Sequence, residues 1–204
     1  TWRVNVTDLL AEDNEIVVAV DNAPNDHVYP QMADFTFYGG LYRDVNVISV
    51  SDAHFDLDYY GSPAIKVTPE VTGDDAKITT EVYLTNAGST EELVFTITDG
   101  DTVVDTVTVS ADKTEVEQTI TNVHLWNGRK DPHLYTMHAE LKKNGTVVDE
   151  RSTRFGCRTF KVDPEKGFFL NGEHYPLRGV SRHQDRPHIG NALTPEMHEE
   201  DAKI

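Results

Sequence analysis

The chain has 204 residues, of which 35 are acidic and 18 are basic, so its formal net charge is −17. This length is sufficient for one large or two small domains with buried cores. The acidic balance disfavours nucleic acid and anionic membrane surfaces as partners. No apolar run approaches about 18 residues, which argues against a transmembrane helix. No signal peptide is recognisable either, and the sequence does not decide between a cytoplasmic and an exported protein.

The chain contains one cysteine, Cys157. A single cysteine cannot form an internal disulfide, so the fold is not held together by one. Cys157 lies between Phe155 and Phe160, and this apolar context predicts a small core residue and not a nucleophile.

The N-terminal quarter reads as strands and loops. Residues 2–6 alternate between apolar and polar side chains, and residues 15–21 form a β-branched apolar run. Both patterns predict strands. An aromatic segment then pivots on Gly39-Gly40 and leads into a further predicted strand over residues 41–50.

The central part of the chain predicts seven short strands separated by turn residues, which include a hairpin signal at Asn144-Gly145. Such a series is typical of an immunoglobulin-like sandwich. Trp126 lies in a Pro-containing stretch at the edge of this sandwich. We interpret it as a core residue in preference to a sugar-stacking platform. The predicted strands cover residues 64–71, 76–84, 93–98, 102–109, 115–123, 133–141 and 146–155.

The C-terminal part changes character. Asn171-Gly172 predicts a tight hairpin, and a short strand over residues 178–180 precedes the polar cluster of residues 181–188. Thr194-Pro195-Glu196 predicts the start of a helix. A strand, a polar loop and a helix make one unit of a (β/α)8 barrel, with the polar loop as one wall of a pocket. The alternative interpretation is a solvated loop after an edge strand.

Three stretches resemble glycoside hydrolase family 2, which includes β-galactosidases, β-glucuronidases and β-mannosidases. The run FFLNGEHYPLRGVSRHQD is similar to the entry into the catalytic barrel of that family, except that Ser181 replaces a common Asn. Its continuation through GNAL resembles the β-galactosidases most. The pattern DF…YGGLYRDV resembles the end of the sugar-binding jelly roll, and LW…P.LY with FG.R resembles the second domain.

The resemblance implies an all-β chain with three parts. Residues 1–51 are expected to be the C-terminal part of the jelly roll, with its strands. Residues 61–158 are expected to form the immunoglobulin-like sandwich of about seven strands, and residues 159–204 the truncated start of the (β/α)8 catalytic domain.

The implied activity is retaining hydrolysis of terminal β-galactosides, with two glutamates that lie beyond Ile204. We therefore expect no catalytic residue in this chain, which alone should be inactive, and we interpret the acidic residues of the C-terminal helix as a solvated face. The alternatives are β-glucuronidase or β-mannosidase activity, or a non-catalytic carbohydrate-binding or spacer module. The helix residues concerned are Glu196, Glu199, Glu200 and Asp201.

The resemblance also implies site residues. His183 is expected to hydrogen-bond sugar hydroxyls, since the ends of barrel strands face the active site. Asp34 is expected to bind a sugar hydroxyl or to ligate a cation. Arg182 is either a further substrate-binding residue or, like Arg43, a structural donor that holds a loop. Asp185 is a candidate for orienting Arg182 or His183.

The expected partners follow from the same resemblance. The substrate would be a β-galactoside or oligosaccharide, and apolar surface left uncovered by the barrel would favour homo-oligomers. We expect no cofactor in this chain itself, although the resemblance implies Mg²⁺ or Na⁺ ions in full-length members. No metal-binding cluster stands out in the sequence.

Overall fold

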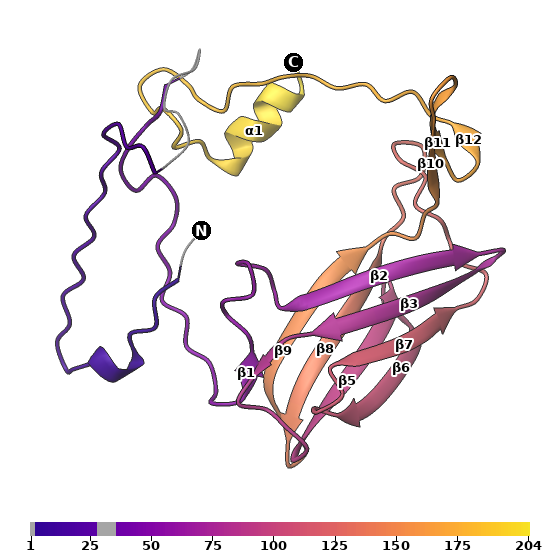
Figure 1. Cartoon of the computed structure of the whole chain (residues 1–204), viewed down its shortest axis with the longest axis horizontal. Coiled ribbons are helices and arrows are strands. Elements are labelled where there is room, and N and C mark those ends of the chain that lie inside the picture. Colours follow the sequence, from indigo (N-terminus) through magenta and orange to yellow (C-terminus); the bar gives the residue numbers. More distant parts are fainter. Residues whose placement is uncertain (1–2, 28–35) are drawn as a thin grey trace. The chain divides into compact units, whose positions relative to one another are not determined.

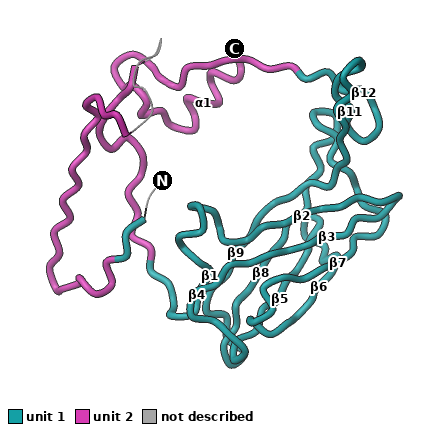
Figure 2. Tube along the Cα trace, viewed as in Figure 1, with its two compact units in different colours: residues 1–5, 49–177 teal, residues 6–48, 178–204 magenta. Residues whose placement is uncertain are grey.

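The computed structural model of the chain describes residues 3–27 and 36–204. The chain divides into two compact units (Figure 2). Unit 1 comprises residues 1–5 and 49–177, and unit 2 comprises residues 6–48 and 178–204. Among the described residues, no helix has the length and apolar character needed to cross a membrane.

Seven strands of unit 1 form two antiparallel sheets, which confirms the predicted sandwich (Figure 1). One sheet has the order β2 (Ile65–Thr72), β3 (Asp75–Val82) and β7 (Glu115–Ile120). The other has the order β6 (Thr102–Ser110), β5 (Glu91–Asp99), β8 (Tyr135–Lys143) and β9 (Thr146–Phe155). A short pair, β1 (His54–Phe55) with β4 (Leu84–Thr85), adds to the same unit.

The core of unit 1 is built from alternate residues of these strands. Successive side chains of a strand point to opposite faces, so every second residue of β5 and β8 is buried. Cys157 is also fully buried, as predicted, and burial raises the pKa of its thiol to about 11. The fully buried side chains of β5 and β8 are Leu93, Phe95, Ile97, Met137, Ala139 and Leu141.

Two predicted Asn-Gly hairpins are confirmed. Asn144 (φ 51°) and Gly145 (φ 77°) connect β8 to β9. Asn171 (φ 50°) and Gly172 (φ 83°) connect β11 (Gly167–Leu170) to β12 (Glu173–His174). Both residues of each pair adopt the positive φ that tight hairpin turns require. Beside the first hairpin, the β8–β9 register shifts between Leu141 and Lys142.

The remaining elements are short. β10 (Phe160–Asp163), β11 and β12 form a three-stranded sheet in unit 1. Unit 2 contains a 3-10 helix, η1 (Thr7–Leu9), and the α-helix α1 (Pro195–Ala202). The helix predicted after Thr194 is therefore confirmed.

The strands predicted within residues 1–51 and at residues 178–180 are wrong. The described residues of the expected jelly-roll strands 2–6, 15–21 and 41–50 are irregular, as is the expected barrel strand 178–180, where Val180 is 95% exposed. A β-branched run becomes a strand only when a neighbour accepts and donates its ladder hydrogen bonds. No described segment supplies such a neighbour to these runs, so the structure contains the helix of the expected barrel unit without the expected strand.

Candidate functional site

The polar residues that precede α1 form a loop that contacts the aromatic segment of unit 2. We call residues 181–192 the motif loop. Tyr38 Oη donates a hydrogen bond to Asp185 Oδ2 at 3.4 Å. The Tyr38 ring also packs on Gly190, where an added Cβ atom would lie 2.9 Å from Tyr38 Cε1. Two of the stretches that carry the family resemblance are thus neighbours in the folded unit.

A second contact ties these stretches together. The Arg43 guanidinium donates to the backbone oxygens of Tyr42, at 2.9 Å, and of Asn191 in the motif loop. This confirms the expected structural role of Arg43. Beside this contact, Tyr38 and residues 185–190 line an open cavity of about 610 Å³, a volume within the range of small-molecule sites.

The arginines of the motif loop anchor α1. Arg182 and Arg186 both form ion pairs with Asp201, and Arg186 also pairs with Glu200 at 2.8 Å. The hydrogen bonds from Arg182 and then Arg186 lower the pKa of the Asp201 carboxyl. The expectation of a wholly solvated acidic helix face is therefore wrong at Asp201, whose side chain is only 22% exposed. Arg182 Nη1 also lies 3.1 Å from His198 Nδ1. The guanidinium of Arg182 therefore connects the motif loop to α1.

The three substrate-binding candidates are placed differently. His183 is an exposed residue of the motif loop. Asp34 lies outside the described residues, so its roles in sugar and cation binding stay predictions. The assignments of His183 and Arg182 as substrate contacts also stay predictions. The sequence did not indicate the contact between Tyr38 and Asp185, because 146 residues separate the two in the chain.

Trp126 lies at the edge of the sandwich and is half-buried, so it is not part of the fully buried core. Its backbone N–H donates to the Cys157 carbonyl at 2.8 Å, and its carbonyl accepts from Asn171 Nδ2 at 3.0 Å. The Arg158 guanidinium carbon lies 5.0 Å from the ring centroid, a cation–π distance. The prediction of a core residue is thus corrected to a ring packed at the edge beneath an arginine.

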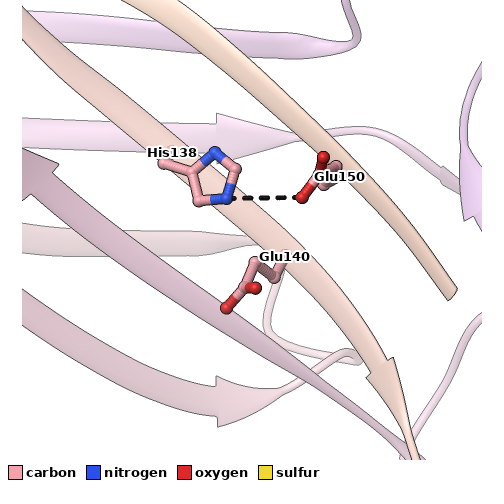
Figure 3. A group of neighbouring side chains, drawn as sticks. All are labelled: His138, Glu140 and Glu150. Carbon is pink, nitrogen blue, oxygen red and sulfur yellow. Dashed lines mark ion pairs between the residues drawn. The ribbon is translucent and has the colours of Figure 1, made fainter. Parts of the chain in front are cut away.

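A cluster of metal-ligating side chains lies on the outer face of the β8–β9 pair, and the sequence did not reveal it. The donor atoms of His138, Glu140 and Glu150 all lie within 4.8 Å of one another (Figure 3). The sequence carries no dependable signal for this cluster, because the register that places Glu140 opposite Glu150 depends on the shift between Leu141 and Lys142.

Comparison with known proteins gives a consistent family. Residues 63–158 match the model of glycosyl hydrolases family 2. A β-glucuronidase of Bacteroides fragilis is 38% identical over 211 residues, which cover 98% of this chain and 30% of that protein. A β-galactosidase of Thermoanaerobacter pseudethanolicus is 26% identical over 203 residues, which cover 94% of this chain and 26% of that protein.

Solved structures agree with this family. An FMN-binding β-glucuronidase from Faecalibacterium prausnitzii L2-6 superposes with a TM-score of 0.84 and is 44% identical, covering 89% of this chain and 28% of that one. A structure described as a putative β-galactosidase from Bacteroides fragilis has a TM-score of 0.69 and 36% identity, covering 76% of this chain and 25% of that one. The chain belongs to glycosyl hydrolases family 2, and it spans 25–30% of the length of the relatives described above.

Proposed function

We propose that the protein to which this chain belongs is a retaining glycosidase that hydrolyses β-glucuronides. The observation that carries the proposal is the 44% identity to the Faecalibacterium β-glucuronidase over 89% of this chain. The 38% identity to the Bacteroides fragilis β-glucuronidase supports it independently. We propose this substrate in place of the β-galactoside that was expected from the sequence of the motif loop.

We propose that the motif loop contributes to the sugar-binding pocket of that enzyme. The imidazole of His183 can hydrogen-bond a sugar hydroxyl. Tyr38 and Asp185 hold the loop through the 3.4 Å hydrogen bond between them, so they act as positioning residues. Arg182 and Arg186 are engaged by α1 carboxylates. For this reason we do not assign either guanidinium to the carboxylate of a glucuronide.

A β-galactoside is the second candidate substrate. The specific observation in its favour is the 36% identity to the structure described as a putative β-galactosidase. Relatives named β-galactosidase at 26–28% identity are consistent with it.

We propose that the two catalytic carboxylates are not in this chain, which alone should be inactive. A retaining glycosidase holds its two carboxyl groups about 5–5.5 Å apart around the scissile bond. Glu140 and Glu150 come within 4.8 Å of each other. They lie on an outer sheet face, however, and do not line the cavity beside the motif loop.

The test is steady-state kinetics on p-nitrophenyl β-D-glucuronide and β-D-galactoside, with the 204-residue chain and with the complete enzyme that contains it. We expect no turnover by the chain alone, and a higher kcat/KM for the glucuronide with the complete enzyme. Turnover by the chain alone would overturn the placement of the catalytic carboxylates. A higher kcat/KM for the galactoside would establish the second candidate in place of the first.

A further inference from the structure

We propose that His138, Glu140 and Glu150 form a surface binding site for a divalent first-row transition metal ion such as Zn²⁺. The three residues project from β8 and β9 on the face of the sheet that points away from the sandwich core (Figure 3). These residues belong to unit 1, whereas the motif loop belongs to unit 2, and the proposal does not depend on the substrate of the enzyme.

The spacing of the donor atoms fits a metal ion. His138 Nε2 lies 3.6 Å from Glu150 Oε2. Two ligands bound tetrahedrally at about 2.0–2.1 Å from zinc are roughly 3.4 Å apart. The full set of donors lies within 4.8 Å, so all three can coordinate one ion after side-chain rotations that shorten these separations toward about 3.4 Å.

The histidine is already oriented for coordination. His138 Nδ1 is 2.6 Å from Ser152 Oγ, and Ser152 lies directly opposite His138 in the β8–β9 register. Metal-binding histidines use one ring nitrogen for the metal and the other for such a hydrogen bond, which fixes the ring. The contact with Ser152 leaves Nε2 as the nitrogen directed at Glu150.

The sheet also places two negative charges where a cation is needed. Glu140 and Glu150 are direct cross-strand partners, and like charges in this position destabilise a sheet. Lys142 offsets part of this repulsion, since its Nζ lies 2.9 Å from Glu140 Oε2. A divalent ion between the carboxylates would offset more of it and would compete with Lys142 for Glu140.

The donor set indicates the class of metal. One imidazole nitrogen with two carboxylates suits zinc and its neighbours in the first transition row. Mg²⁺ and Ca²⁺ prefer oxygen ligands, so they are the probes for discrimination. Three protein ligands leave coordination positions for water.

The experiment is calorimetric titration of ZnCl₂ into the 204-residue chain, with MgCl₂ as the comparison probe. We expect one zinc site that Mg²⁺ does not fill at the same concentration. His138→Gln and Glu150→Gln should each weaken zinc binding by tenfold or more, and Ser152→Ala by roughly 10-fold through the orientation of the imidazole. Both ligand positions are solvent-accessible in the fold, and circular dichroism verifies that each variant is folded.

Lys142→Met provides the most specific result. It removes the competing ammonium group without removing a ligand, so zinc affinity should rise. His174→Gln, an exposed histidine of β12 outside the cluster, is the matched control and should bind zinc as the unsubstituted chain does. Equal zinc affinity in the unsubstituted, His138→Gln and Glu150→Gln chains, or no zinc binding at all, would overturn the proposal.

Discussion

The packing of Tyr38 on Gly190 predicts that Gly190→Ala, which adds one methyl group, strongly reduces the local stability of the motif loop. The loss has a backbone part and a steric part that can be measured separately. Gly190 has φ +54°, a left-handed conformation that costs an L-residue roughly 1–2 kcal/mol. In Gly190→Ala the new Cβ would also lie 2.9 Å from Tyr38 Cε1 and 3.0 Å from Cδ1. Displacing a packed ring in this way costs about 1–3 kcal/mol. The two costs together give about 2–5 kcal/mol of local destabilisation in the motif loop.

Amide hydrogen exchange measures this cost within the loop itself. The Ala192 N–H donates to the Ile189 carbonyl at 3.1 Å, so its exchange rate reports local opening. Each 1.4 kcal/mol corresponds to a tenfold change, so exchange should be roughly 30-fold to several thousandfold faster in Gly190→Ala. In a Tyr38→Ala background the ring is absent. The same substitution should then cost only the backbone part, or about 5–30-fold.

Comparing the effect of Gly190→Ala with and without Tyr38→Ala tests whether the Tyr38 ring packs on the motif loop. An equal cost for Gly190→Ala in both backgrounds would refute the close packing of Tyr38 on the motif loop, because the steric part depends on that ring. A smaller cost in the Tyr38→Ala background supports the contact by which the structure joins the aromatic segment to the loop.

Three further predictions concern unit 1. Phe95 occupies a fully buried position of β5, so Phe95→Ala should lower the free energy of unfolding, measured in urea, by about 3–5 kcal/mol. The control is Val94→Ala on the outer face of the same strand, which should lower it by about 1 kcal/mol or less. Equal losses of stability in the two variants would contradict the assigned faces. Hydrogen bonds from Lys143 and two further donors lower the pKa of Glu91 from 4.5 to about 2. The ionised Glu91 therefore contributes fully to stability above pH 4.5, and this contribution is lost as the pH falls toward 2. Acid unfolding curves should show this loss, and Glu91→Gln should remove that part of the pH dependence. Cys157 is fully buried, and the pKa of its thiol is raised to about 11. Iodoacetamide at pH 8 should therefore not modify Cys157 in the native chain, but should modify it in urea. Labelling of the native chain at the rate of the unfolded chain would contradict this burial.

The sandwich could be predicted from the sequence because its signals are local. Alternating apolar residues set the faces of β5 and β8, and Asn144-Gly145 set a hairpin. The same β-branched signal failed in residues 15–21 and 41–50, because strand formation depends on a pairing partner that composition does not supply. Local propensity therefore predicted strands where the ladder exists and also where it does not.

The sites were harder to predict because they depend on register and on contacts between distant segments. A hairpin at Asn144-Gly145 without irregularity would place Glu140 opposite Asp149. The register shift beside Leu141 places it opposite Glu150 instead, next to the His138–Ser152 pair. A bulge of this kind has no dependable sequence signal. The Tyr38–Asp185 contact likewise required the fold to bring two distant stretches together.

The most direct test of the central claim, that the motif loop belongs to the sugar-binding site of a glycosidase, is the kcat/KM of the complete enzyme carrying His183→Ala. The substrate is p-nitrophenyl β-D-glucuronide, and the melting temperature is measured alongside. The account predicts a fall of about tenfold or more, equivalent to roughly 1.4 kcal/mol of transition-state stabilisation, with an unchanged melting temperature. An unchanged kcat/KM in a folded variant would contradict a role for His183 at the substrate and would leave the motif loop as a structural connection to α1.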